Sequence, residues 1–134
     1  MRLFIDANVL FSAAYNPAGR PARLFDLAAD LGFELVSSDY AANEAMINLQ
    51  RKRPEAVAHL SLIIGKLRLF AWSAREPCPV PLPDKDRPIL AAAIEARCDV
   101  LITGDVRDFG AFIDKPKLTG GVRIVTLKGF LELR

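Results

Sequence analysis

Acidic residues lie at the edges of the apolar segments of this chain, where packing alone would not require them. Asp84 and Asp86 come just before an apolar helical segment, and Asp105 and Asp108 come just after an apolar strand-like segment. At the start of the chain, the apolar stretch RLFI is followed directly by Asp6. Carboxylates that meet without counter-charge repel one another, and a divalent cation removes that penalty. Because oxygen ligands favour hard ions, the pattern indicates a site for Mg²⁺ or Mn²⁺.

Such a site would hydrolyse phosphate esters. Mg²⁺ that is held by a few carboxylates keeps several of its waters, and one of these can act as the nucleophile. The ion also neutralises a substrate phosphate that the acids would otherwise repel. The expected reaction is therefore the metal-assisted hydrolysis of a phosphoester.

Each acid also has a purely structural interpretation. Asp86 can cap the helix that follows it, and Asp105 in Thr-Gly-Asp can be a turn residue. Glu44, in the second turn of a predicted helix, can be a solvated surface residue, and Asp6 can serve only in a turn. The metal interpretation depends on these four acids falling on one rim of the predicted fold.

Strands alternate with helices along the chain, and most of the strands are apolar throughout. The apolar runs and turn residues predict strands at 2–5, 33–37, 67–72, 99–103 and 122–126, helices at 21–31, 40–51, 54–64 and 87–97, a helical turn from 9 and a short terminal helix. Either Ser38 or Asp39 caps the helix from Tyr40, and Gly32 ends the helix before it. This alternation is typical of a parallel sheet that is buried on both faces and binds ligands beyond the carboxyl ends of its strands.

The composition is that of a single globular domain spanning residues 1–134. Hydrophobic residues make up 51% of the chain, which excludes a disordered protein, and no apolar run approaches the ~20 residues of a membrane span. Because the chain enters a strand at once, we expect no signal peptide and a cytoplasmic location. Cys78 and Cys98 lack CxxC spacing and clustered histidines, so we expect neither a zinc site nor a disulfide. His59 is the sole histidine, which gives triad chemistry little support.

Several stretches together resemble the PIN domain family. They are FIDANVL, a helical glutamate at position 44, and KDRPILAAAIEARCDVLITGD with Asp108 after it. The resemblance covers almost the whole chain and is strongest to single-domain prokaryotic PIN proteins regarded as toxins of toxin–antitoxin systems. It implies a three-layer α/β/α sandwich with a central parallel five-stranded sheet. It also implies a Mg²⁺- or Mn²⁺-dependent endoribonuclease acting on single-stranded RNA, a homodimer and a cognate antitoxin protein.

The resemblance assigns roles to individual residues. The metal-binding and catalytic acids would be Asp6, Glu44, Asp86 and Asp105. Asn8 would orient Asp6 or a water on the metal, and the other auxiliary residues would be Thr103, Asp108 and Asp84. We further expect basic residues on the rim to hold the RNA backbone, and the candidates are Arg20, Arg23, Arg51 and Arg107.

Other functions remain open from the sequence. A non-catalytic α/β module that binds RNA or protein would use the same fold without metal-dependent cleavage. A phosphatase of the haloacid dehalogenase type also begins with a strand followed by Asp, but it needs a second Asp where this chain has Asn8. Metal titration combined with a nuclease assay separates these functions from a ribonuclease.

Overall fold

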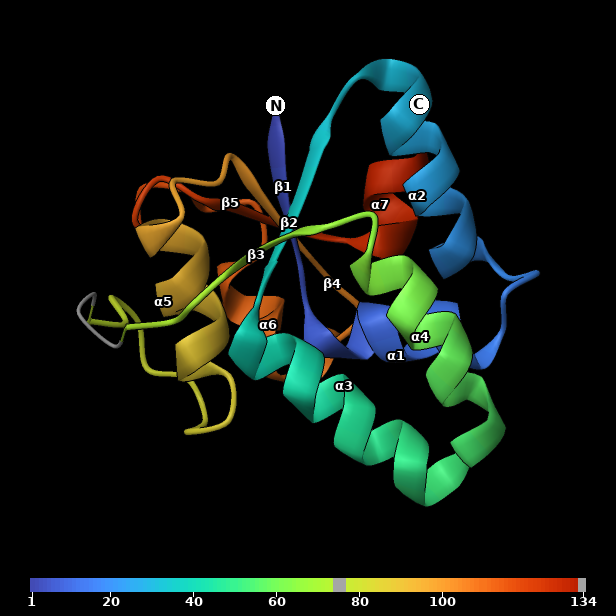
Figure 1. Cartoon of the computed structure of the whole chain (residues 1–134). Helices are drawn as coiled ribbons and strands as arrows, with labels where there is room; N and C mark the ends of the chain where they lie inside the picture. The colour runs from blue at the N-terminus through green and yellow to red at the C-terminus, as the bar shows by residue number, and fades with distance from the viewer. Residues whose placement is uncertain (74–76, 133–134) are drawn as a thin grey trace.

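A five-stranded parallel sheet forms the centre of the structure, a computed structural model that describes residues 1–73 and 77–132 (Figure 1). Its strands are β1 (Arg2–Ile5), β2 (Glu34–Ser38), β3 (Arg68–Phe70), β4 (Val100–Thr103) and β5 (Arg123–Thr126). They are arranged in the order β3-β2-β1-β4-β5, and every neighbouring pair is parallel. The predicted parallel sheet is thus confirmed, and the carboxyl ends of all its strands lie at one edge.

Helices cover both faces of this sheet. In the described residues they are α1 (Ala7–Tyr15), α2 (Arg20–Leu31), α3 (Asp39–Lys52), α4 (Val57–Ile64), α5 (Arg87–Glu95), α6 (Val106–Phe109) and α7 (Leu127–Glu132), with 3₁₀ turns η1 (Pro54–Ala56) and η2 (Gly110–Phe112). Figure 1 shows α1, α2, α4 and α7 on one side of the sheet and α5 on the other. The predicted α/β/α sandwich is therefore confirmed.

The core follows from where the apolar residues fall. Leu3, Phe4 and Ile5 in the central strand β1 are fully buried, as are Leu101 and Ile102 in its neighbour β4. A strand with helices on both faces buries both sets of alternating side chains, which explains these continuous apolar runs.

Helix α5 is buried almost all round, and this fixes the position of its first turn. Its residues from Pro88 to Ala93 are all buried, as expected for a helix that is apolar on every face. It packs against β2, β4 and α3, while Val80 and Leu82 of the proline-rich connection join the same core. Asp86, which directly precedes α5, is therefore held by a rigid element.

Residues at the helix ends account for two boundaries. The hydroxyl of Ser38 accepts a hydrogen bond from the backbone N–H of Ala41 at 3.1 Å, so Ser38 rather than Asp39 caps α3. Gly32 ends α2 in the left-handed conformation with φ +71°, as predicted, and its N–H bonds to the carbonyls of Ala28 and Ala29.

Two segments differ from the sequence prediction. The predicted helical turn after Asp6 is a helix of nine residues, α1. The segment after Asp105, predicted as a loop, contains α6 and η2, and it buries Phe109 completely. A helix of four residues is too short to show a 3.6-residue period, so the sequence pattern did not reveal it.

The cysteine thiols take no part in a disulfide. Cys78 and Cys98 are both free. Burial raises the pKa of Cys98 to about 12, so this thiol is an apolar core group rather than a nucleophile. Within residues 1–73 and 77–132, no helix is long and apolar enough to cross a membrane.

Candidate metal centre

Asp6 is the first residue after the central strand, and its side chain is buried. One carboxylate oxygen accepts a hydrogen bond from the N–H of Ala7 at 2.6 Å, and the other accepts one from the hydroxyl of Thr103 at 2.7 Å. Asp6 thus caps α1 while it is tied to the end of β4. Burial raises the pKa of Asp6 to about 7, and the charges of Asp86 and Glu44 raise it further against the two hydrogen bonds.

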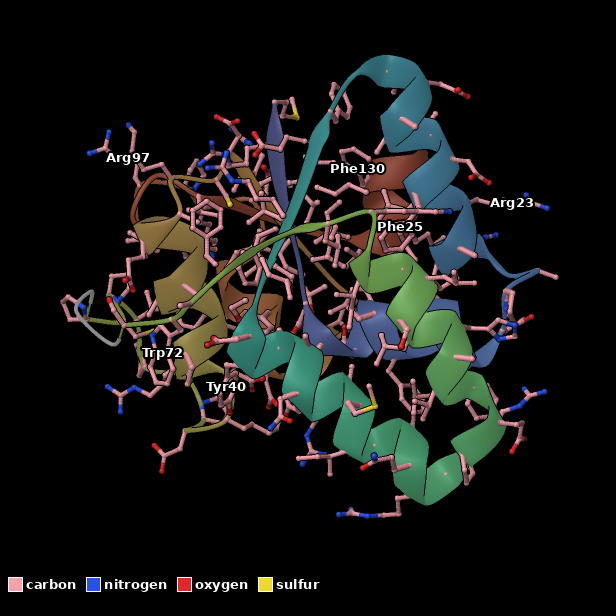
Figure 2. All side chains as sticks on the ribbon, in the orientation of Figure 1. Arg23, Phe25, Tyr40, Trp72, Arg97 and Phe130 are labelled. Carbon is pink, nitrogen blue, oxygen red and sulfur yellow. The ribbon has the colours of Figure 1, made fainter. Side chains whose placement is uncertain are left out.

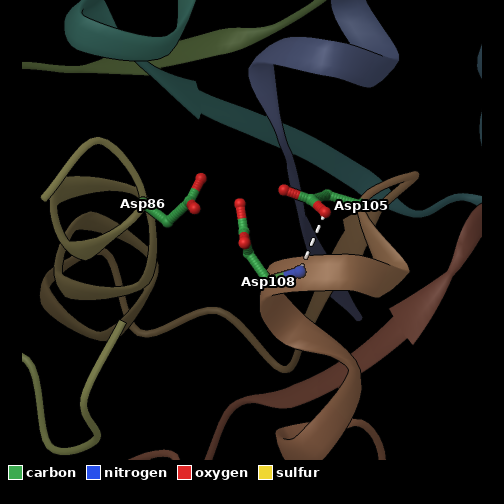
Figure 3. Close-up of side chains that lie close together, drawn as sticks. All are labelled: Asp86, Asp105 and Asp108. Carbon is green, nitrogen blue, oxygen red and sulfur yellow. Dashed lines mark hydrogen bonds between the residues drawn. The ribbon is translucent and has the colours of Figure 1, made fainter. Parts of the chain in front are cut away.

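Three further acids converge beside this position. Asp86, Asp105 and Asp108 each offer a carboxylate oxygen, and these oxygens all lie within 4.8 Å of one another (Figure 3). Asp105 caps α6 by accepting a hydrogen bond from the N–H of Asp108 at 3.0 Å. Asp86 occupies the N-cap position of α5, but its side chain makes no cap hydrogen bond, so capping does not account for its carboxylate. Burial raises the pKa of Asp86 to about 6, against the lowering effect of Lys85.

A lysine that sequence reasoning missed lies among these three acids. The ammonium of Lys85 is 3.1 Å from an Asp86 oxygen, 3.0 Å from an Asp108 oxygen and 3.6 Å from an Asp105 oxygen. The hydrogen bond from Lys85 holds the pKa of Asp108 below its usual range, and the acids raise the pKa of Lys85 in turn. The cluster therefore attracts a cation, and Lys85 supplies one from the chain itself.

The four acids predicted to bind metal line one cavity. Its volume is about 320 Å³, and its walls include Asp6, Glu44, Asp86 and Asp105. Glu44 reaches it from α3, and burial raises the pKa of this carboxyl. The structure thus brings together residues from the ends of β1 and β4 and from helices α3 and α5. Asp108, predicted as auxiliary, does not line this cavity, but its carboxylate lies close to those of Asp86 and Asp105.

Asn8 and Thr103, both predicted as auxiliary, connect the acids to the backbone. Thr103 is fully buried; its hydroxyl donates to Asp6 and accepts from the N–H of Asp105 at 2.9 Å. The Asn8 side-chain oxygen accepts from the N–H of Gly104 at 3.0 Å. These bonds join the end of β1 to the turn after β4, so the carboxylates of Asp6 and Asp105 are held in a fixed relation.

The remaining predicted residues lie outside the cavity. The side chain of Asp84 is fully exposed and lies 3.9 Å from the guanidinium of Arg87. The predicted RNA-binding arginines Arg20, Arg23, Arg51 and Arg107 are all exposed, and Figure 2 shows Arg23 pointing outward from α2. In the described part of the chain, the basic residues that line the cavity are instead Lys52 and Lys85. The four-residue spacing of Glu44, Asn48 and Lys52 was the signal in the sequence for Lys52.

The donor set fits a hard divalent cation. Its ligand atoms are carboxylate oxygens without sulfur or imidazole nitrogen, which suits Mg²⁺ or Mn²⁺ rather than zinc or copper. Burial raises the pKa of Asp6 and of Asp86, so a bound cation would stabilise the charged form of both carboxyls. The ammonium of Lys85 marks where a positive charge is stabilised.

Replacing Thr103 by valine tests whether its hydroxyl positions the acids. Valine keeps the shape but removes the hydroxyl partner of one Asp6 carboxylate oxygen and of the N–H of Asp105, so the free energy of unfolding should fall by about 1–3 kcal/mol. Loss of a group that orients ligands typically weakens metal binding about 10–100-fold, which Mn²⁺ calorimetry measures. The matched control is Thr126→Val at the paired position of β5, where the hydroxyl accepts from Gly129. Equal Mn²⁺ affinity in the wild type and Thr103→Val would contradict this role.

Replacing Lys85 by methionine tests the internal cation. The three acids then repel one another without compensation, so in EDTA the protein should lose about 1 kcal/mol, the scale of a partly exposed ion pair. Added Mn²⁺ should raise the melting temperature of this variant more than that of the wild type, since no ammonium competes for the carboxylates. Lys128→Met, which removes a surface pair with Glu132, is the control. Equal shifts of the melting temperature with Mn²⁺ in Lys85→Met and Lys128→Met, measured by calorimetry, would refute the role of Lys85 as an internal cation.

Fold and site together define a class of protein: a parallel α/β sandwich with a cation-attracting cluster of acids at the carboxyl edge of its sheet. The sequence matches the PIN domain family over residues 2–107. The chain belongs to this family, and the resemblance seen in the sequence is confirmed.

Solved structures show the same fold at low sequence identity. VapBC2 from Rickettsia felis, bound to a DNA fragment from its promoter, has a chain that superposes with a TM-score of 0.71 at 14% identity, covering 94% of this chain and 98% of that one. DNA-bound VapBC from Salmonella typhimurium gives 0.68 at 14% identity, covering 95% and 98%. VapC20 from Mycobacterium tuberculosis, a toxin that cleaves the sarcin-ricin loop, gives 0.61 at 13% identity, covering 82% and 95%. A search of curated proteins found no match.

Proposed function

We propose that this protein is a Mg²⁺- or Mn²⁺-dependent endoribonuclease that hydrolyses phosphodiester bonds of single-stranded RNA. The observation that carries the proposal is the meeting of Asp6, Glu44, Asp86 and Asp105 around one cavity, from four separate parts of the chain. Membership of the PIN domain family supports it. So does the likeness of fold to VapC20, a toxin that cleaves the sarcin-ricin loop.

Different residues of the site would have different roles in this reaction. Asp86, Asp105 and Asp108 would hold the cation with Asp6 beside them, and Thr103 and Asn8 would keep Asp6 and Asp105 in place. A bound Mg²⁺ or Mn²⁺ would neutralise the scissile phosphate and increase the acidity of water. Glu44 is on the wall formed by α3 and has a raised pKa, so it would orient the attacking water and accept its proton.

The same comparisons support a partner protein. Several structures of similar fold are VapBC assemblies, and we propose that this chain is the toxin of a toxin–antitoxin pair. Its antitoxin would bind it and block the acidic cavity. We also propose that the protein acts in the cytoplasm as a homodimer.

The direct test incubates the purified protein with a pool of RNA and with Mn²⁺, Mg²⁺ or EDTA. We expect internal cleavage of single-stranded RNA with either metal, and none in EDTA. A non-catalytic module would show no metal-dependent cleavage. Cleavage of a small phosphomonoester without cleavage of RNA would favour the phosphatase instead and refute the proposed activity.

A further inference from the structure

The cavity extends away from the acids along the groove between α1 and α3. On α3 its lining residues Glu44, Asn48 and Lys52 recur every four positions and so form one stripe. On α1 the opposite wall contains Asn8 and Phe11. From Glu44 to Lys52 the helix rises about 12 Å. The groove therefore begins at the carboxylates and ends at an exposed cation.

The far end of the groove combines aromatic rings with cations. The ammonium of Lys52 lies 5.6 Å from the ring centroid of half-buried Phe11. Tyr15 lies one turn of α1 beyond Phe11 and is 40% exposed. The guanidinium of Arg53, the residue after Lys52, lies 4.9 Å from the ring centroid of Tyr15. The two rings are neighbours, with centroids 5.5 Å apart.

The charge of Lys52 contacts the Phe11 ring but is not paired with a carboxylate of the described residues. Lys52 is exposed, and no carboxylate in residues 1–73 and 77–132 forms an ion pair with it. By contrast, Lys85 in the same cavity is surrounded by acids. Lys52 is thus the cation of this cavity that is free to meet an anionic ligand.

We propose that Phe11, Asn48 and Lys52 form a subsite for one nucleotide of single-stranded RNA next to the scissile phosphate, and that Tyr15 and Arg53 continue it. This inference rests on the proposed function and assigns the substrate's path. Proteins bind single strands by stacking bases on aromatic rings while cations follow the phosphates. Lys52 would bind a phosphate, Phe11 would stack a base, and the Asn48 amide would hydrogen-bond its edge. A duplex keeps its bases stacked inside, so the subsite selects a single strand.

Binding experiments on the Asp105→Asn protein, in which cleavage is suppressed, test this subsite. Fluorescence anisotropy with a labelled single-stranded RNA in Mn²⁺ is measured over a range of salt concentrations. Lys52→Met should weaken binding and reduce the slope of log affinity against log salt by about 0.7, the value for one phosphate contact on a single strand. Lys52→Arg should restore the slope. Lys117→Met, an equal loss of charge at an exposed position elsewhere, should leave it unchanged.

A second pair of measurements tests stacking. Phe11→Leu keeps apolar packing but removes the ring, so the affinity for RNA should fall about 5-fold or more. The affinity of Phe11→Leu for an abasic strand of equal length should not change. The control variant, Phe112→Leu, should bind both strands as the parent protein does. Circular dichroism verifies the fold of each variant.

Several results would overturn the subsite. One is an equal salt slope for Lys52→Met and Lys117→Met. Another is a loss of affinity in Phe11→Leu that is the same for the RNA as for the abasic strand. Cleavage by the wild type, measured in parallel, tests the proposed function separately. A wild-type protein that cleaves RNA while all variants bind it equally would overturn the subsite alone.

Discussion

Replacing Asp105 by asparagine should reduce metal-dependent RNA cleavage by roughly 10³-fold, equivalent to about 4 kcal/mol of transition-state stabilisation. Asp105 is one of the three clustered acids, and the amide lacks the charge that a divalent cation needs. The fold should be retained, because the side-chain oxygen of asparagine can still accept the hydrogen bond from the N–H of Asp108 that caps α6. Initial rates on a fluorescent single-stranded RNA in saturating Mn²⁺ give the effect, and thermal unfolding verifies the fold.

The chain provides a matched control for this variant. Asp84→Asn makes the same change of acid to amide close to Asp86, but the Asp84 side chain is fully exposed and pairs only weakly, at 3.9 Å, with Arg87. Its cleavage rate should remain within about twofold of the wild type, as for surface changes outside a site. Full activity in Asp105→Asn, or equal losses in both variants, would remove Asp105 from the metal centre.

The parts of the fold that the sequence predicted are those where burial determines composition. β1 and β4 pack against helices on both faces, so their residues are apolar throughout and could be recognised as strands. Helix α6 could not be recognised, because its stability comes from the Asp105 cap and the burial of Phe109 rather than from a periodic pattern. Its short length also explains why Asp108 was predicted as auxiliary only: a turn of helix brings it back toward Asp86.

The residues of the candidate site also divide into those that the sequence could predict and those that it could not. Acids that follow strands or precede helices of a parallel sheet must arrive at its carboxyl edge, so topology alone could predict Asp6, Asp86 and Asp105. The contact of Lys85 with Asp108 joins residues 23 positions apart, and it depends on how α6 packs near the start of α5. No local pattern contains that information. The exposed arginines were predicted from their charge and an expected place on the rim. The lining of the cavity by Lys52 depends instead on the packing of α3 against α1.

Those acids of the site whose pKa is raised should make the metal-free protein less stable as pH rises, and Asp6 should contribute most. Its pKa in the folded protein is about 7, against an ordinary value of 3.8, because burial disfavours the charged form. Below that ordinary value the carboxyl is protonated in both the folded and the unfolded chain, and it contributes nothing. Between the two values only the unfolded chain has released the proton, so each pH unit costs about 1.4 kcal/mol. Above pH 7 the cost stays constant, at roughly 4 kcal/mol at most.

Replacing Asp6 by asparagine should therefore stabilise the protein in EDTA. Asparagine has no charge to bury, and its side-chain oxygen can still accept the hydrogen bond from the N–H of Ala7. Chemical denaturation should show the variant more stable than the wild type by a few kcal/mol at pH 8, by less at pH 5 and by little near pH 4. Added Mn²⁺ should narrow the gap at pH 8, because it binds the wild type more tightly and so stabilises it more. Asp30→Asn on the exposed face of α2 should show no such dependence, and a gap for Asp6→Asn that is independent of both pH and Mn²⁺ would show that Asp6 is only a helix cap.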